Sequence, residues 1–198
     1  MRQRICDAAM KIFLEEGFAK ATMRRIASEI EYAPGAIYSY FDDKQAVLTE
    51  LQTTGFARLR ALLTAVPANR DPFDHLRALG RAYLRFAFDN PEYYDLMFIM
   101  DMGSPAAEHD APRPGLDTYD LLRQQVKRCQ DAGSMPRYDL EAAALALWSM
   151  VHGIAALVVK QRLGMIPEKV RPMLVDAAYE FGLEGMRLRR PAVRRRAK

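Results

Sequence analysis

The side chains with the clearest chemistry lie between Thr22 and Lys44, where hydroxyl, guanidinium, phenol and ammonium groups alternate with apolar residues. A threonine in front of an apolar helical pattern caps a helix, and the helix N-terminus that it creates also suits a phosphate. Arg24 lies one turn on, off the apolar face, and could donate in parallel to guanine O6 and N7 or remain a solvated arginine. Arg25 is a weaker candidate, either a phosphate contact or a solvated side chain.

Two tyrosines in the same stretch are candidate contacts of a second kind. Tyr38 and Tyr40 face solvent if Ile37 and Phe41 point inward, and exposed aromatic side chains are the less common case. Tyr38 could donate to a phosphate and Tyr40 could touch a base or the backbone. Ala36 offers only a methyl group, which suits the methyl group of thymine.

Helices must position these groups, because apolar residues recur at helical spacing almost throughout and no segment alternates long enough for a strand. We expect an all-α fold of about nine helices. Gly17 ends the first helix, Thr22 caps the second, Pro34 starts a very short third, and Asp42-Asp43 offers a cap for a helix from Lys44 toward Ala65. The expected later helices cover about 76–90, 93–102, 119–133, 139–163 and 167–188, with a mobile loop at 103–115.

Three helices in about forty residues, the last two joined by a tight turn, match the helix-turn-helix plan. The stretch resembles the TetR/AcrR family of bacterial transcriptional regulators in Gly17-Phe18, Thr22-x-Arg24-x-Ile26-Ala27, Pro34-Gly35-x-Ile37-Tyr38-x-Tyr40-Phe41, Lys44 and Val47-Leu48. More loosely, Pro91-Glu92-Tyr93-Tyr94-x-Leu96-Met97-Phe98 and Trp148-x-x-x-His152-Gly153 resemble the ligand-domain subtype named for its Trp-His-Gly signature. The resemblance implies a homodimeric, mostly repressing regulator that a small molecule releases from double-stranded DNA.

The resemblance also implies the residues that contact DNA, and Lys44 is a phosphate clamp by resemblance or a solvated lysine otherwise. The family usually has glycine where Glu31 stands and a serine or threonine cap where Ala33 stands. The candidate DNA contacts are Thr22, Arg24, Arg25, Ala33, Pro34, Gly35, Ala36, Tyr38, Ser39, Tyr40 and Lys44.

Residues 66–165 would hold the effector in an adaptable apolar pocket rich in aromatic residues and methionine. The candidate effector contacts are Tyr83, Phe86, Tyr93, Met97, Phe98, Trp148 and His152. The alternative interpretation makes most of these residues core only, and favours a buried, hydrogen-bonded His152 over a ligand contact.

The last two helices carry the broadest apolar surface and are the expected dimer interface, a four-helix arrangement with the partner copy. The candidate interface residues are Leu147, Val151, Ile154, Val158, Met173, Leu174, Ala177 and Phe181. Residues 142–159 form an uncharged run at the lower limit of a membrane span, but three polar or small residues interrupt it, so we expect a central buried helix and no membrane partner.

Charge and composition restrict the remaining possibilities. The 198 residues carry a net charge of +4, and the segment 187–198 alone holds seven Lys and Arg. This basic segment either makes nonspecific contacts with phosphates or serves as a solubilising end. Two distant cysteines and no secretory signal favour a cytoplasmic protein with reduced thiols. We expect no cofactor and no metal, and the three histidines form no catalytic pattern, so an enzyme is not expected.

The expected domains are a helix-turn-helix domain at 1–48, an effector-binding and dimerisation domain at 49–190 and a basic tail at 191–198. The alternative function is a helical ligand-binding or scaffold protein without sequence-specific DNA binding, which the acidic balance of the first fifty residues favours.

Overall fold

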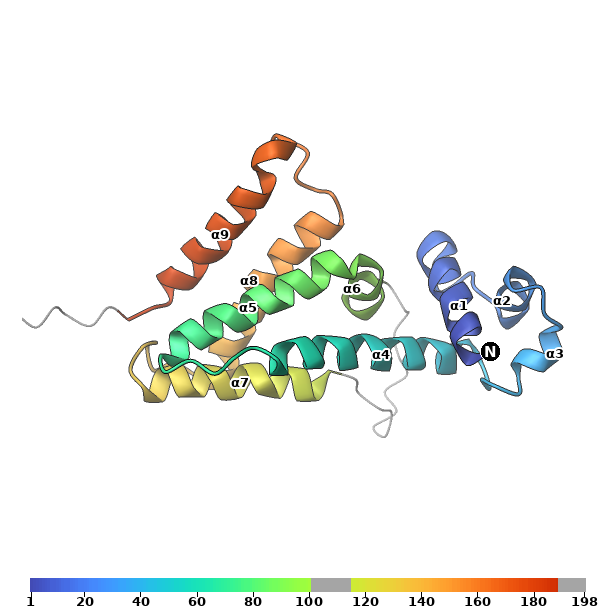
Figure 1. Cartoon of the computed structure of the whole chain (residues 1–198), viewed down its shortest axis with the longest axis horizontal. Helices are drawn as coiled ribbons and strands as arrows, with labels where there is room; N and C mark the ends of the chain where they lie inside the picture. Colours follow the sequence, from blue (N-terminus) through green and yellow to red (C-terminus); the bar gives the residue numbers. More distant parts are fainter. Residues whose placement is uncertain (101–114, 189–198) are drawn as a thin grey trace, which may run out of the picture. The chain divides into compact units, whose positions relative to one another are not determined.

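The computed structural model describes residues 1–100 and 115–188, and those residues form nine α-helices and one short 3-10 turn but no strand (Figure 1). This confirms the all-α class and the expected number of helices. The predicted loop at 103–115, apart from Gly115, and the predicted basic tail lie outside the described residues. The helices are α1 (Arg2–Glu16), α2 (Met23–Glu29), α3 (Pro34–Ile37), α4 (Lys44–Thr64), α5 (Pro72–Asp89), α6 (Pro91–Phe98), α7 (Leu116–Asp131), α8 (Leu140–Val159) and α9 (Arg171–Gly185), with the 3-10 turn at Glu168–Val170 before α9.

The chain divides into two compact units. Unit 1 contains residues 1–62 and 85–118, and unit 2 contains residues 63–84 and 119–198. Unit 1 therefore includes the helix-turn-helix segment together with most of α4, the end of α5 and all of α6, and extends beyond residue 48.

Side-chain caps begin three of the helices where the sequence predicts them. Thr22, Asp43 and Asp139 each accept a hydrogen bond from the backbone N–H three residues on, at 3.1, 2.7 and 2.9 Å. Each cap satisfies one of the backbone donors that the first helical turn leaves without a partner. Ala33 precedes α3 without a side-chain cap, and Pro34 is the first residue of that helix.

The core of unit 1 is formed by the inward faces of α1, α2 and α4. Ile12, Ile26 and Leu48 are fully buried, and the rings of Phe13 and Phe18 meet edge to face at 5.3 Å. Removal of this apolar surface from water stabilises the unit and fixes how the short helices α2 and α3 are held.

In unit 2, α5 and α9 lie close together at a glycine. A Cβ atom on Gly80 would overlap the phenol of Tyr179, whose hydroxyl donates to the carbonyl oxygen of Arg77 at 2.9 Å. The Arg77 guanidinium also pairs with Glu180 at 3.0 Å and with Glu184. A buried phenol and a network of charges therefore join these two helices.

Helix α8 is not the central buried helix that we expected. It is the one described helix long and apolar enough to cross a membrane by length and composition, yet only 22% of its most apolar window is buried within the chain. Length and apolar composition alone are weak evidence for a membrane span, because a helix that packs against other helices has the same composition. Most of the apolar window of α8 is therefore left uncovered by the described residues.

The end of α8 also differs from the prediction, which extended the helix to Leu163. The helix ends at Val159, and Gln161 takes a left-handed backbone with φ 53°. The N–H groups of Gln161 and Arg162 donate back to the carbonyl oxygens of Val158 and Leu157 at 3.0 and 2.8 Å. This arrangement is a Schellman motif, which usually has glycine at the left-handed position, so the sequence did not signal it.

Both cysteines are reduced and buried. Burial raises the pKa of the Cys6 thiol, and separately that of Cys129, to about 11. Both therefore remain neutral thiols near pH 7.

Candidate nucleic-acid interface

The turn between α2 and α3 is a second Schellman motif. The N–H of Tyr32 donates to the carbonyl oxygen of Ala27 at 2.9 Å, and the N–H of Glu31 donates to that of Ser28 at 3.2 Å. Glu31 occupies the left-handed position with φ 56°. This position favours glycine because glycine has no Cβ to clash, which explains physically why the TetR/AcrR pattern has glycine here.

Helix α3 and the residues that follow it direct some side chains into the core of unit 1 and others toward solvent. Ile37 and Phe41 are buried, whereas the Tyr38 and Tyr40 side chains are 52% and 36% exposed, as the sequence predicts. Of the remaining candidates in this segment, Ala36 is half-buried and the others, Ala33, Pro34, Gly35 and Ser39, are exposed. The whole outer face of α3 is therefore available to a partner.

Two arginines of α1 hold the ends of α2 and α3 in place. Arg2 donates to the carbonyl oxygen of Tyr40 at 2.8 Å and pairs with Glu50 at 3.2 Å. Arg4 donates to the carbonyl oxygen of Ile30 at 3.3 Å. A cation at a helix C-terminus satisfies free carbonyl groups and is favoured by the helix dipole, so these side chains support the turn.

Arg25 is bound by carboxylates within unit 1, and its role as a DNA contact stays a prediction. Its guanidinium pairs with Glu16 at 2.9 Å and with Glu29 at 2.8 Å, and Lys11 joins the same cluster at 2.6 Å from Glu29. The hydrogen bonds to Glu29 and Glu16 raise the pKa of Arg25. The side chain thus links α1 to α2, a role that spacing alone could not reveal because Glu16 belongs to another helix.

Lys44 is also engaged within unit 1, and its role as a phosphate clamp stays a prediction. The ammonium donates to the carbonyl oxygens of Phe18, Ala19 and Ala21 at 2.8, 3.4 and 3.1 Å. It also lies 4.4 Å from the centre of the Phe18 ring. Three acceptors use all three donors of an ammonium group. Lys44 therefore holds the loop between α1 and α2 against the start of α4.

Two cations of the first fifty residues, Arg24 and Lys20, are not bound within the described part of unit 1. Both are exposed, and neither has a hydrogen-bond or ion-pair partner within the part of the chain that the structure describes. Lys20 was not among the predicted contacts, although it precedes the capping residue Thr22 by two positions. Its sequence signal is only a positive charge in a turn, which is not specific. Thr22 is exposed as well and caps α2.

The predicted effector residues divide between the two units. In unit 2, the Tyr83 hydroxyl lies 3.2 Å from Nδ1 of His152, and the Trp148 ring lies 5.7 Å from the His152 ring and 5.9 Å from that of Tyr119. Burial lowers the pKa of His152, which is therefore mainly neutral at pH 7. The alternative interpretation of His152 as a half-buried, hydrogen-bonded side chain agrees with this geometry.

The other predicted effector residues belong to unit 1. Phe86 is fully buried, Phe98 packs against the rings of Tyr94 and Phe56 at 5.3 and 5.5 Å, and Tyr93 and Met97 lie against Gly55 of α4. Within unit 1, Tyr93, Met97 and Phe98 form part of the packing of α4 and α6, and Phe86 is a buried residue of α5.

The predicted dimer surface needs a correction on α8. Leu147 and Val151 are buried inside the chain, and Ile154 and Val158 are half-buried, so these residues pack within the subunit. The exposed residues of α8 follow a neighbouring line at helical spacing: Leu145, Ser149, Gly153 and Leu157. On α9 the predicted residues Met173, Leu174, Ala177 and Phe181 are all exposed.

Comparisons with known proteins agree with this architecture. Residues 5–51 match the family model "Bacterial regulatory proteins, tetR family", and residues 76–181 match "Tetracyclin repressor-like, C-terminal domain". The Trp-His-Gly subtype is not confirmed by these matches. The HTH-type transcriptional regulator YobS of Bacillus subtilis is 23% identical over 81% of this chain and 80% of its own length.

Two further proteins extend the likeness. The HTH-type transcriptional regulator AcrR of Shigella flexneri is 27% identical over 77% of this chain and 75% of its own. A bacterial regulatory protein in the TetR family from Rhodococcus shares the fold with a TM-score of 0.73 and 22% identity, over 93% of this chain and 96% of its own. With a family model that covers more than half of the chain, the conclusion is that this protein belongs to the TetR family of bacterial transcriptional regulators, which bind DNA.

Proposed function

We propose that the protein is a cytoplasmic repressor that binds an inverted-repeat DNA site as a homodimer and is released by a small apolar or aromatic molecule. The observation that carries the DNA-binding part is the contrast among the cations of residues 1–50. Five cations are bound within the unit, namely Arg2, Arg4, Lys11, Arg25 and Lys44, whereas Arg24 and Lys20 are exposed without a hydrogen-bond or ion-pair partner among the described residues.

Within this proposal, each exposed side chain of the interface has a distinct role. Arg24 donates to guanine in the major groove, while Lys20 and the Tyr38 hydroxyl contact phosphates, which position the domain without reading sequence. The Thr22 hydroxyl accepts the N–H of Arg25, and its own hydrogen can donate to a phosphate. Ala36 places a methyl group where a thymine methyl can pack.

The proposed dimer uses the uncovered faces of α8 and α9. Phe181 and Met173 are 84% and 64% exposed, and Leu145 on α8 is 52% exposed. Large apolar side chains in such a continuous band indicate an interface rather than a solvent-facing surface. A two-fold dimer would present two α3 helices to half-sites about one DNA turn, ~34–36 Å, apart.

A matched pair of substitutions tests this surface. Phe181→Glu should give a monomer, because it places a charge in the apolar band. Met165→Glu, at an equally exposed position (80%) outside α8 and α9, should leave the dimer intact. Sedimentation velocity distinguishes the two, and a Phe181→Glu variant that remains dimeric would remove α9 from the interface.

The effector is proposed to bind beside the aromatic cluster of unit 2. Tyr83, Tyr119, Trp148 and a neutral His152 together offer aromatic surface with few polar groups, which favours an apolar or aromatic molecule. Trp148 is the single tryptophan of the chain, so its fluorescence reports on this cluster alone. A compound that releases DNA should change that fluorescence, and release by every active compound without such a change would place the effector elsewhere.

The DNA-binding function itself is tested by selecting sites from random duplex DNA with the purified protein. Enrichment of an inverted repeat supports a dimeric repressor. Absence of any enriched sequence, with the protein shown to be folded and free of effector, would favour the alternative of a ligand-binding protein without a specific DNA site.

A further inference from the structure

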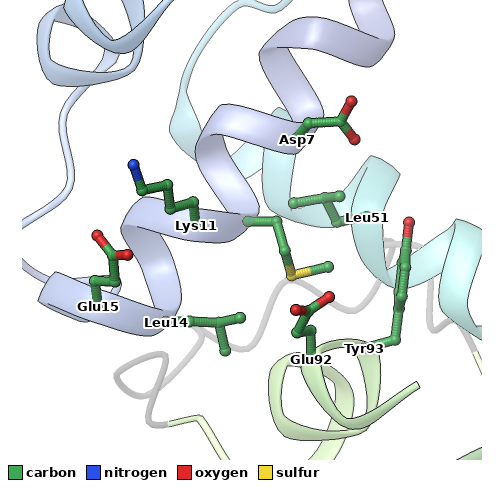
Figure 2. A pocket seen from close by; sticks show the side chains of 8 residues that line it. Asp7, Lys11, Leu14, Glu15, Leu51, Glu92 and Tyr93 are labelled. Atoms are coloured by element: carbon green, nitrogen blue, oxygen red, sulfur yellow. The ribbon is translucent and has the colours of Figure 1, made fainter. Parts of the chain in front are cut away.

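Unit 1 contains a hollow that no part of the proposed function uses. It has a volume of about 310 Å³ and lies between α1, α4 and α6 (Figure 2). This volume is at the lower end of the range for small-molecule sites. The lining residues are Asp7, Met10, Lys11, Leu14 and Glu15 of α1, Leu51 of α4, and Glu92 and Tyr93 of α6.

The inner part of the hollow is apolar, and its lining includes a methionine that can change conformation. Met10 and Leu51 are buried, and Leu14 and the Tyr93 ring are half-buried, so a hydrocarbon chain or a ring could displace water there. Methionine adapts its shape to an occupant more readily than a branched side chain does.

Carboxylates dominate the polar part of the hollow. Glu15 and Glu92 are exposed and have no hydrogen-bond or ion-pair partner among the described residues, and Asp7 accepts one hydrogen bond, from Gln3 at 2.8 Å. The Lys11 ammonium does not balance these charges, because Glu29 binds it at 2.6 Å. Three carboxylates therefore surround an apolar floor with no free cation among the lining residues.

Glu92 and Tyr93 bring α6 into the site. Figure 2 shows both side chains rising from α6 toward the residues of α1 and α4. Burial raises the pKa of the Tyr93 phenol, and the charges of Asp7 and Glu92 raise it further, while Arg58, 4.5 Å from the ring centre, acts in the opposite direction. The phenol therefore remains neutral and can accept a hydrogen bond from an ammonium group.

We propose that this hollow binds a small organic cation, an ammonium group carried on an aliphatic chain or a ring. The ammonium lies beside the Glu92 carboxylate, and the hydrocarbon part covers Met10, Leu14 and Leu51. The occupant joins α1 to α6. The site is separate from the aromatic cluster proposed for the effector, all of which belongs to unit 2, and its existence does not depend on DNA binding.

The direct test is calorimetric titration of the full chain with n-hexylamine, which is protonated at pH 7, beside hexan-1-ol as an uncharged control of the same length. We expect saturable binding of one hexylammonium per subunit, with hexan-1-ol at least about tenfold weaker because it lacks the charge.

Variants then place the binding site. Glu92→Gln should weaken hexylammonium binding by about tenfold, since it removes the charged acceptor, and Asp7→Asn should weaken it less, since it removes a more distant charge. Glu168→Gln, at an exposed carboxylate in the 3-10 turn of unit 2, is the matched control and should bind as the parent does. Leu14→Trp should block the floor and abolish binding, with circular dichroism showing that the fold is retained.

Three results would overturn the proposal: no saturable binding, equal affinity for hexan-1-ol, or affinity unchanged in both carboxylate variants. If the amine instead alters Trp148 fluorescence and ignores Glu92→Gln, it occupies the aromatic cluster, and the hollow is not the site.

Discussion

The N–H of Tyr32 lies 2.9 Å from the carbonyl oxygen of Ala27, and this hydrogen bond closes the turn that separates α2 from α3. The bond requires the residue before Tyr32 to take a left-handed backbone, and that residue is Glu31, with φ 56°. A side chain with a Cβ atom is strained in this conformation. The turn that orients the candidate DNA-reading helix therefore carries a local cost and a negative charge at one position.

Replacing Glu31 by glycine should remove both. Glu31→Gly should stabilise the protein by about 0.5–1 kcal/mol, because the relief of strain exceeds the extra entropy of the unfolded chain. Equilibrium urea denaturation measures this change. Glu31→Gln keeps the Cβ and removes only the charge, so it should raise DNA affinity without raising stability.

Gln161→Gly provides the matched control for strain, since Gln161 has φ 53° at the end of α8. It should stabilise the protein to a similar degree and leave DNA affinity unchanged. A stability gain for neither glycine variant would show that the left-handed positions are not strained.

Arg24 and Arg25 are adjacent, yet they should respond to substitution in opposite ways. Arg24→Ala should weaken binding to the selected site by ~1–3 kcal/mol and leave the unfolding curve unchanged, because this exposed side chain has no hydrogen-bond or ion-pair partner among the described residues. Arg25→Ala should lower stability instead, because it releases Glu16 and Glu29. Fluorescence anisotropy with labelled DNA and urea denaturation separate the two effects, and full affinity in Arg24→Ala would exclude Arg24 from the interface.

Lys44 and Lys20 allow the same comparison between a lysine bound within the unit and an exposed one. Lys44→Met should destabilise the protein by about 1–3 kcal/mol, since three carbonyl groups lose a charged donor. Lys20→Met should leave stability unchanged and weaken binding to all DNA sequences alike, as expected for a phosphate contact. If instead Lys44→Met weakened DNA binding with no loss of stability, Lys44 would be the phosphate clamp that the family resemblance implies.

Helix α6 packs closely against α4 at Gly55. A Cβ atom there would overlap Sδ of Met97 and lie 3.0 Å from a ring carbon of Tyr93, so Gly55→Ala should cost about 1–3 kcal/mol. Gly164→Ala is the control, because nothing lies within 4 Å of this position, which is outside α8 and α9. Thermal unfolding of both variants checks the difference. Equal stability of Gly55→Ala and the parent would mean that Met97 moves aside freely.

The local features of the fold were predictable, and the partners of charged side chains were not. The caps formed by Thr22, Asp43 and Asp139 are hydrogen bonds to backbone N–H groups only three residues later in the chain. The burial of Ile37 and Phe41 likewise follows from helical spacing. These are short-range relationships that a sequence pattern encodes.

Lys44, in contrast, binds a carbonyl group 26 residues earlier in the chain. Glu16, one partner of Arg25, belongs to a different helix, so neither pairing has a local signal. The sequence also could not predict which side of α8 is buried. A helix that is apolar on every side has no periodicity from which to choose Leu147 over Leu145, and only packing decides it.

The most direct measurement of the central claim is the affinity for the selected DNA site as a function of salt concentration, in the full chain and in a variant truncated after Leu188. Lys20 from each of two subunits neutralises a phosphate, whereas Arg24 reads a base, so log K of the truncated dimer should fall against log salt with a slope of about −2. The full chain should show an equal or steeper slope, and the difference counts the phosphates bound by the arginine-rich end. A slope near zero would contradict DNA binding through this face, and a slope near −8 in the truncated protein would contradict the internal engagement of Arg25 and Lys44.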